Sequence, residues 1–570
     1  MDTKKLILYA ALGIVCFALW NAWQADYPEA SLFSIFGGSS TVKAKVNTDT
    51  NTSATNIGAV PSAVSQAKSN SVTEQKAVAP LNAPSGRLIT VKTDVLEVAI
   101  DTLGGSVVSA KLLKYPENIN QPQPVQLFNE NADKFYIAQN GLINSKGDET
   151  KQIQYAATEK SFSLDPDKNQ LIVKLSAKDG HGVEYRKTYT FVRSNYDIKV
   201  DNSIDNDSNQ KWVGKFFASI TRKDVAEQET SKFRSTFRGV SLSSAEKHYE
   251  KFSYGDLAKK NIDRDILGGW ISIQQHYFLS AWVPDKTKSY HYFSEPLTNN
   301  VYTAGLINNN VTVAAGDELN ISSVLYVGPD TADNLKGLAP YLDLTVDYGW
   351  LWPISVSLFW IMKHINSFVN NWGWTIILVT LLIKAAFFKL SETSYRSMAR
   401  MKELAPRLQT LKERYGDDRQ KLNEATMEMY RKEKINPLSF GGCLPMIIQI
   451  PVFIGLYYVL IAAVELRQAP FIFWIHDLSA KDPYYVLPIL MGLSMLGQQL
   501  LNPQMTTDPM QAKMMTYLLP IVFTVLFISF PSGLVLYWFV NNCISALQQW
   551  YINRRYTKTH HRKHTVTQGA

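Results

Sequence analysis

The chain has 570 residues, a formal net charge of +8 at pH 7 and a mean hydropathy of −0.12. This mean joins two unlike halves, a polar stretch to about residue 345 and an apolar stretch beyond it, so the composition indicates a membrane protein with soluble parts. Cys16, Cys443 and Cys543 all lie in or beside apolar segments, which excludes a disulfide framework or a cysteine-based zinc site in the polar region.

The first 24 residues predict a transmembrane signal anchor. Two lysines precede an apolar run from residue 6 to 20 that extends to Trp23. A cleaved signal peptide is the alternative, but the run is long for a signal core and its flanking lysines favour a cytoplasmic N-terminus. Residues 25–86 are rich in Ser, Thr, Asn, Ala and Val without lasting periodicity, which predicts a flexible linker on the outer side.

Residues 87–340 predict one large antiparallel β sandwich. Short alternating segments such as GVEYRKTYTFV and YDIKVDNSI are separated by Gly, Asn, Asp and Pro, and no helical stretch is long enough for crossovers. Histidines are scattered through this region without ligand spacing, so no metal site is expected; they are His181, His248, His276 and His291.

The segment 366–555 predicts a core of five transmembrane spans. Five candidate spans lie at about 372–389, 445–465, 484–501, 515–531 and 533–551. The distribution of Lys and Arg places both termini and the segment 391–440 in the cytoplasm, which gives six spans with the β domain outside between the first and second. Residues 345–365 mix Trp and apolar residues with a polar edge and predict an amphipathic helix in the outer interface.

The segment 391–440 predicts a charged cytoplasmic helical hairpin. Apolar residues recur at spacings of three and four until Gly416 breaks the pattern. A solvated linker or a surface for anionic lipid are alternatives, but the length and periodicity favour a docking role. The residues expected to form the docking surface are Met398, Met401, Leu404, Leu408, Arg414, Tyr415 and Asp417. The basic tail 556–570 is expected to contact ribosomal RNA or to serve as an ordinary positive flank.

Lys384 lies within the second predicted span. A lysine at the centre of a membrane helix costs about 2.5–3.5 kcal/mol on insertion scales, so its presence indicates function. Thr380 lies one turn earlier and shares its helix face. Other spans contribute Gln449, Gln498, Thr524 and Asn541. Two interpretations stay open at this point: a wet cavity open to one side, or a lysine that snorkels to the cytoplasmic interface among ordinary interhelical hydrogen bonds.

The sequence offers no sign of an enzyme. It contains no G-x-x-x-x-G-K-[ST] motif and no evident nucleophile–base pair, which indicates a binder or conduit without a cofactor. A secondary transporter of small anions is an alternative, but it should show repeated halves with matching broken helices. A sugar-binding or sugar-modifying outer domain is a further alternative, although no paired carboxylates stand out.

Several long motifs, in order, resemble the YidC-type (YidC/Oxa/Alb) membrane protein insertase family in its Gram-negative form. They are INPLSFGGCLPMIIQIPVFIGLYYVL (435–460), ELRQAPFIFWIHDLSAKDPYYVLPILMG (465–492), TDPMQAKMM (507–515) and FPSGLVLYWFVNN (530–542). The resemblance implies a polytopic α-helical membrane protein with six transmembrane helices, a five-helix insertase core around a hydrophilic groove, and a large periplasmic β-supersandwich domain. Lys384 takes the place of the family's groove cation, where the best-known members have Arg.

The same resemblance implies the activity and the partners. Groove and substrate-contact positions match Thr380, Phe453, Met491, Tyr537 and Trp538. The family inserts and helps fold integral membrane proteins in the bacterial inner membrane, alone or with the Sec translocon. The expected partners are nascent membrane proteins, the Sec translocon, the lipid bilayer, and the ribosome or signal-recognition-particle receptor at the hairpin and tail. No small-molecule substrate, metal or cofactor is expected.

Overall fold

A computed structural model describes residues 56–57, 79–80, 87–144, 153–225, 237–308, 310–416, 418–432, 444–501 and 513–567. All of them belong to the second of two compact units, Thr55–Ala570. The predicted signal anchor, almost all of the predicted linker, Asp417 and the side chain of Met401 lie outside what is described. Within the linker region, β1 (Asn56–Ile57) and β2 (Ala79–Pro80) form a two-stranded parallel pair.

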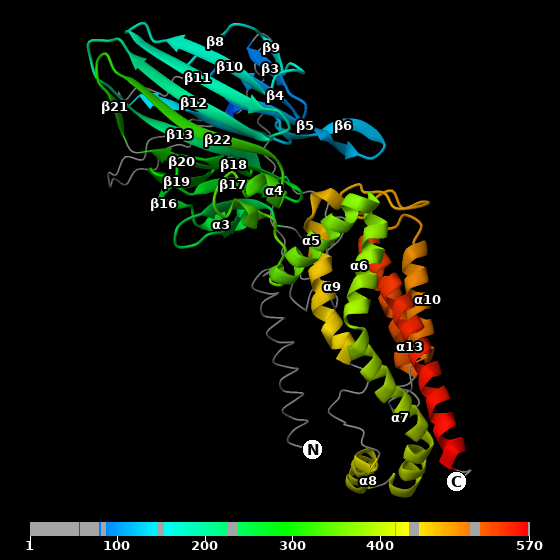
Figure 1. Cartoon of the computed structure of the whole chain (residues 1–570). Helices are drawn as coiled ribbons and strands as arrows, with labels where there is room; N and C mark the ends of the chain where they lie inside the picture. Colours follow the sequence, from blue (N-terminus) through cyan, green and yellow to red (C-terminus); the bar gives the residue numbers. More distant parts are fainter. Residues whose placement is uncertain are drawn as a thin grey trace, which may run out of the picture. The chain divides into compact units, whose positions relative to one another are not determined.

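Two large sheets form the β-rich domain (Figure 1). The first sheet contains nine strands, each antiparallel to its neighbours. In spatial order they are β15 (Glu250–Ser253), β14 (Gly239–Ser243), β17 (Trp270–Gln275), β18 (Phe278–Val283), β22 (Glu318–Pro329), β12 (Asp197–Asn206), β11 (Val183–Val192), β10 (Gln170–Lys178) and β8 (Ala156–Ala157).

The second sheet contains eleven strands. Its main path runs through β16 (Asp263–Leu267), β19 (Ser289–Pro296), β20 (Val301–Asn308), β13 (Trp212–Lys223), β7 (Tyr136–Asn144), β5 (Ser106–Asn118), β4 (Leu96–Asp101), β3 (Leu88–Lys92) and β9 (Ser161–Ser163). In addition, β21 (Val311–Val313) pairs with β13 and β6 (Gln121–Phe128) pairs with β5. Among the described strands of this sheet, only β3 and β9 pair in parallel.

The sandwich core follows from the alternating sequence pattern. Along β11, buried residues alternate with less buried ones, as expected for strands with one face toward a core. Hydrogen bonds also join the two sheets: the Tyr136 hydroxyl pairs with Ser280, and the Trp282 indole donates to the carbonyl of Ser219 at 3.0 Å. A β-rich domain built from two packed sheets agrees with the expected sandwich.

A lysine is buried in this domain, and no described carboxylate forms an ion pair with it. Lys187 of β11 is 0% exposed, and its ammonium donates to the carbonyl of Gly104 at 2.8 Å, and to the carbonyl and side-chain oxygens of Asn140 at 2.6 and 2.9 Å. Burial disfavours the charged form and lowers the pKa of Lys187 to about 7. The unfolded chain therefore binds more protons than the folded chain between about pH 7 and the ordinary lysine pKa of about 10.4.

We expect the free energy of unfolding of the β domain to rise with pH across this window, by up to about 1.4 kcal/mol per pH unit. Lys187→Met should remove this rise, whereas Lys199→Met, at a mostly exposed position on β12, should keep it. Urea unfolding of the full-length protein in detergent at pH 7, 8 and 9, followed by limited proteolysis of the β domain, measures the slope. An equal slope in wild type and Lys187→Met would contradict the assignment.

Three short helical elements lie within the β domain or at its end, where the chain continues into the helical part. Within the domain, α3 (Tyr254–Lys259) begins at a capping box formed by Ser253 and Asp256. The domain ends with α4 (Ala332–Leu335) and the 3-10 turn η1 (Leu342–Thr345).

The helical part begins at α5 and continues to the end of the described chain. Its helices are α5 (Trp352–Val369), α6 (Trp372–Ala386), α7 (Phe388–Tyr415), α8 (Arg419–Lys432), α9 (Leu444–Ala462), the 3-10 turn η3 (Val464–Leu466), α10 (Val486–Leu501), the π-helical turn η4 (Met514–Leu518), α12 (Leu519–Phe527) and α13 (Ser532–Thr567). The expected interfacial helix at 345–365 and the expected cytoplasmic hairpin at 391–440 fall largely on α5 and on α7 with α8.

The expected count of six spans is not confirmed. Among the described residues, no single helix is long and apolar enough to cross a membrane. One bent pair, Trp372–Ala386 with Phe388–Arg400, is long and apolar enough when its two helices are taken together. This pair bends by 67°, so the expected span 372–389 is not one straight helix. Three shorter apolar helices are Gln449–Ala462, Val486–Leu501 and Met514–Phe527.

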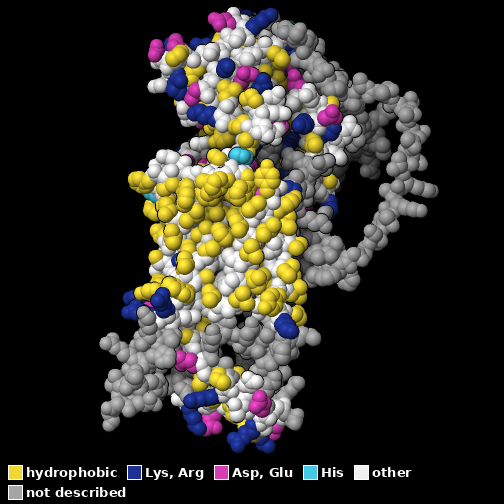
Figure 2. Space-filling model, turned by 90° about the vertical axis from the view of Figure 1, so that its right-hand side faces the viewer, with side chains coloured by type: hydrophobic (Ala, Val, Ile, Leu, Met, Phe, Trp, Pro, Cys, Tyr) yellow, Lys and Arg dark blue, Asp and Glu magenta, His cyan; other side chains and the backbone are white. Residues whose placement is uncertain are grey.

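A broad apolar surface covers the helical part. Figure 2 shows hydrophobic side chains in a wide band over it, with few charged groups among them. On α10, η4 and α12 the large exposed side chains include Ile489, Leu493, Leu500, Met514, Met515, Ile521, Val522 and Val525. Soluble monomers rarely expose contiguous apolar surface of this kind, which indicates contact with lipid or with another protein.

Candidate functional site

Lys384 lies in the last turn of α6, directly before a sharp change of helix direction. Asn371 caps the start of α6, because its side chain accepts a hydrogen bond from the N–H of Trp374 at 3.1 Å. At the other end, α6 stops at Ala386 and α7 resumes at Phe388 with an axis bent by 67°. Neither Pro nor Gly occurs between Lys384 and Phe388, so the bend has no local sequence marker.

The ammonium of Lys384 points inward to α9 and α13. It donates to Gln449 Oε1 at 3.1 Å and to Ser545 Oγ at 2.7 Å, and the residue is only 8% exposed. No described carboxylate lies within 4.0 Å of this ammonium, and its two hydrogen-bond partners, an amide and a hydroxyl oxygen, are neutral. A buried charge with neutral partners keeps an uncompensated positive potential around it.

A polar stripe on α13 lines the opposite side of this site. Tyr537, Asn541 and Ser545 follow one another at intervals of four residues and therefore share one helix face. The Gln449 amide nitrogen donates to the hydroxyl of Tyr537 at 3.2 Å and to the side-chain oxygen of Asn541. Gln449 thus links the lysine to the stripe, and we call Lys384, Gln449, Tyr537, Asn541 and Ser545 the polar cluster.

Aromatic rings adjoin the polar cluster. The ring of Phe453, one turn beyond Gln449 on α9, lies 6.4 Å from the ring of Tyr537 and 4.6 Å from that of Trp538, with the latter pair edge to face. Trp538 in turn lies 5.1 Å from Phe527 and 6.1 Å from Phe523 of α12. The site therefore passes from a charged centre to an aromatic wall within about one helical turn.

The other predicted groove residues occupy different positions. Thr380 is buried on α6, and its hydroxyl donates to the carbonyl of Ile376 at 2.7 Å. Thr524 likewise donates to the carbonyl of Pro520 at 2.7 Å, on its own helix α12. Met491 of α10 is fully buried in the apolar core, and Gln498 is half-buried on the same helix. None of these four side chains has a described hydrogen bond to the polar cluster.

Two residues of the site escaped the sequence analysis. Ser545 binds the ammonium of Lys384, and the amide nitrogen of Gln548 lies 3.4 Å from the carbonyl oxygen of Lys384. The four-residue spacing from Tyr537 through Asn541 to Ser545 is the signal that could have indicated the serine. Asn542, adjacent to Asn541, faces elsewhere and donates to Ser494 of α10 at 3.1 Å.

The space beside Lys384 is small. A hollow of about 30 Å³ is lined by residues that include Lys384, Phe387, Ser391 and Gln449. A cavity needs roughly 10–15 Å³ on this measure to hold one water molecule. The hollow in this conformation therefore has room for water but not for a protein segment.

The base of the expected docking hairpin packs against the end of the polar stripe's helix. Tyr395 and Met398 of α7 form a small buried cluster with Ile552 of α13. Farther along α7, Leu404 is buried and Arg414 is exposed. Leu408 and Tyr415 are half-buried.

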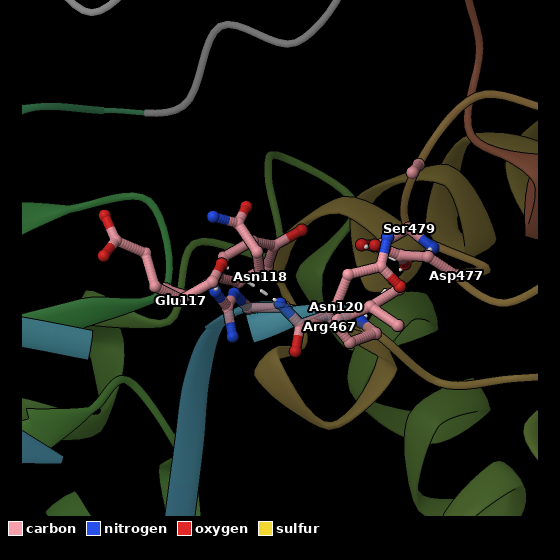
Figure 3. A pocket seen from close by; sticks show the side chains of 10 residues that line it. Glu117, Asn118, Asn120, Arg467, Asp477 and Ser479 are labelled. Carbon is pink, nitrogen blue, oxygen red and sulfur yellow. Dashed lines mark hydrogen bonds between the residues drawn. The ribbon is translucent and has the colours of Figure 1, made fainter. Parts of the chain in front are cut away.

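A second, larger hollow lies away from the polar cluster. It measures about 340 Å³, and Figure 3 shows Glu117 and Asn118 of β5 together with Arg467, Asp477 and Ser479 from the segment between α9 and α10. Arg467 donates to the carbonyls of Pro116 and Glu117 at 2.8 and 3.0 Å. Its guanidinium therefore serves to join this segment to the β5–β6 hairpin.

Comparisons with known proteins agree with this architecture. Residues 88–361 match the family described as YidC periplasmic domain, and residues 364–560 match the family described as 60Kd inner membrane protein. Two relatives are named membrane protein insertase YidC. The one from Coxiella burnetii (strain Dugway 5J108-111) is 49% identical over 562 residues, 98% of this chain and 97% of the relative. The one from Legionella pneumophila (strain Corby) is 47% identical over 564 residues, 98% of each.

Among solved structures, the chain is similar to one titled active YidC insertase with the first transmembrane domain resolved. That similarity has 19% sequence identity and a TM-score of 0.35, and covers 82% of this chain and 93% of the other. The sequence matches define an inner membrane protein with a periplasmic domain. The chain belongs to the YidC family of membrane protein insertases, which confirms the resemblance in the sequence motifs.

Close helix packing beside the site gives a stability prediction. A Cβ at Gly492 of α10 would lie 1.9 Å from the hydroxyl oxygen of Thr524 on α12, whereas a Cβ at Gly497 would meet nothing within 4 Å. Gly492→Ala should lower the melting temperature of the full-length protein in detergent, because overpacking costs about 1–3 kcal/mol. Gly497→Ala should leave it unchanged or raise it slightly, because Ala is the better helix former. Equal melting temperatures for the two variants would argue against the close contact.

Proposed function

We propose that this protein inserts integral membrane proteins into the inner membrane and helps them fold, through the polar cluster around Lys384. The single observation that supports this role is the buried ammonium of Lys384, which Gln449 and Ser545 hold and which has no carboxylate partner among the described residues. Because neutral oxygens satisfy its hydrogen bonds without cancelling its charge, the site attracts an anionic group that arrives from outside.

The attraction lowers the cost of moving a polar tail into the bilayer. The outer tail of an incoming protein segment is polar and often acidic, and unpaired charge is expensive in hydrocarbon. Lys384 and the polar stripe on α13 offer that tail a charge and hydrogen-bonding partners partway along its path. The membrane potential assists acidic tails by about 2.3 kcal/mol per charge per 100 mV.

The apolar part of the segment leaves along a different surface. Phe453, Trp538 and the exposed apolar side chains of α10 and α12 lead from the polar cluster toward lipid. Burial of apolar area stabilises this exit by roughly 25 cal/mol per Å². Because the hollow beside Lys384 holds only about 30 Å³, helices around it must separate when a segment enters.

Short helices favour a thin bilayer at this site. Helix α10 has 16 residues, which corresponds to about 24 Å of helix rise, less than the roughly 30 Å of a typical hydrocarbon core. Local thinning shortens the distance that a polar tail travels through hydrocarbon.

The arrangement in the membrane and the partners belong to the same proposal. The excess of Lys and Arg in 391–440 and after Tyr551 supports six spans with cytoplasmic termini and the β domain in the periplasm. The hairpin of α7 and α8 then faces the cytoplasm, where it receives the ribosome or the signal-recognition-particle receptor, and the core works alone or beside the Sec translocon.

The role requires no bond-making chemistry, so we assign the protein as a non-enzymatic conduit. Full-length relatives are named insertases and give no support to the small-anion transporter considered as the alternative.

Removing the ammonium tests the proposal directly. Purified protein in liposomes should insert a single-span substrate with an acidic tail, measured as protection of that tail from added protease. Lys384→Ala should reduce insertion by about 10-fold or more, because one hydrogen bond to a charged group is worth about 1.5–3 kcal/mol. Lys384→Arg should retain most of it, because the charge is kept.

The matched control is Lys389→Ala, which removes an exposed lysine of α7 only five residues away. Its insertion should equal that of wild type. If Lys384→Ala with an unchanged melting temperature inserts as well as wild type, the polar cluster is not the working site. If wild type alone inserts nothing, the protein does not act without partners.

The basic tail gives a second prediction. Replacing the tail cations Lys558, Arg562 and Lys563, together with Arg554 and Arg555 directly before the tail, by Gln should weaken co-sedimentation with ribosomes. The salt dependence should also become shallower, because each lost phosphate contact reduces the slope of log affinity against log salt by about 0.7–0.9. An unchanged slope would assign these residues to an ordinary positive flank.

A further inference from the structure

The bend after Lys384 removes the usual helical hydrogen-bond partner of its backbone carbonyl. In a continuous helix this carbonyl would accept from the N–H four residues later, at Phe388, which here begins α7 in a new direction. Carbonyls at a helix end need partners from outside the helix. Gln548 of α13 supplies one, with its amide nitrogen 3.4 Å from the carbonyl oxygen of Lys384.

The other end of the same lysine is also held by α13. Ser545 lies three residues before Gln548, so the two side chains share a helix face. The Ser545 hydroxyl donates its own proton to the carbonyl of Asn541 at 2.7 Å, which leaves its oxygen as an acceptor for the lysine ammonium at 2.7 Å. One face of α13 therefore fixes both the backbone and the charge of Lys384.

The Gln548 side chain is not explained by packing alone. Its amide oxygen is buried and has no hydrogen-bond partner among the described residues. An apolar residue of similar length would avoid the cost of this unpaired oxygen. The donated hydrogen bond to Lys384 is therefore the described feature that distinguishes glutamine from methionine or leucine here.

We propose that Gln548 and Ser545 are positioning residues of the insertion site. They hold the bend between α6 and α7 so that the ammonium of Lys384 faces Gln449 and the entering acidic tail, instead of following the α7 direction away from the cluster. The inference rests on the proposed insertase function and adds to it that α13 determines how strongly the site favours acidic tails.

The chain offers a matched control at the next residue. Gln549 also donates to a backbone carbonyl, that of Leu501 at 3.2 Å, but this carbonyl belongs to α10 and not to Lys384. Gln548→Met and Gln549→Met thus remove the same chemical group from neighbouring positions. A general loss of helix packing should affect the two variants alike, whereas the proposed positioning of Lys384 depends, of these two glutamines, on Gln548.

The experiment compares two single-span substrates that differ only in the tail, two Asp against two Asn, inserted by full-length protein in liposomes. Gln548→Met should lower the Asp-to-Asn insertion ratio by about 3- to 10-fold, the factor expected for one lost hydrogen bond. Gln549→Met should keep the wild-type ratio. Ser545→Ala should lower the ratio as Gln548→Met does, and Ser545→Thr, which keeps the hydroxyl, should restore it.

Equal ratios for Gln548→Met and Gln549→Met would overturn the inference, as would an equal loss with both substrates. Melting temperatures in detergent identify a variant that does not fold, and Gln548→Leu then replaces Gln548→Met with the same expected result. Failure of the wild type to insert either substrate would instead contradict insertion by the protein alone, and would overturn this extension together with that part of the proposed function. Wild-type insertion with an unchanged ratio in all α13 variants would overturn only the extension.

Discussion

A buried ammonium with no described carboxylate partner constrains the packing of the helical part. Taking a charge out of water costs several kcal/mol unless well-placed polar groups replace the water. For Lys384 those groups come from α9 and α13, in Gln449 and Ser545. Helices α6, α9 and α13 must therefore pack in one register. The oxygens of Tyr537 and Asn541 complete the polar cluster by accepting hydrogen bonds from Gln449. A carboxylate partner would have satisfied the charge more simply, but would also have cancelled its attraction for an anionic segment.

The β domain contains a second lysine with neutral partners, and the contrast is informative. Lys187 is enclosed between two hydrogen-bonded sheets, where its ammonium bonds to Gly104 and Asn140. Gly104 lies in the turn between β4 and β5, and Asn140 lies in β7. Lys384, by comparison, adjoins a hollow large enough for water and a 67° change of helix direction. Both ammonium groups are thus held by neutral oxygens, and the site between the helices adjoins a hollow through which another group could reach the charge.

Polarity changes along α13 in a way that suits a path between water and lipid. Its stripe carries Asn541 and Ser545 beside the charge, and Tyr537 belongs to both environments, because its hydroxyl accepts from Gln449 while its ring faces Phe453. Trp538 then continues the aromatic wall toward α12. A segment that exchanges hydrogen-bonding partners at one end and apolar contacts at the other meets no abrupt step in solvation.

Local pattern determined much of this protein from sequence alone: the alternation that builds the strands, the apolar helices, the motifs that identify the family, and Lys384 with Gln449 and Asn541 as site candidates. Tertiary structure decided the rest. The bend follows no Pro or Gly, Thr524 turns back to its own helix, and Ser545 and Gln548 acquire meaning only opposite a lysine more than 160 positions away. Periodicity reports which residues share a face of one helix, but which faces meet depends on the packing of distant segments.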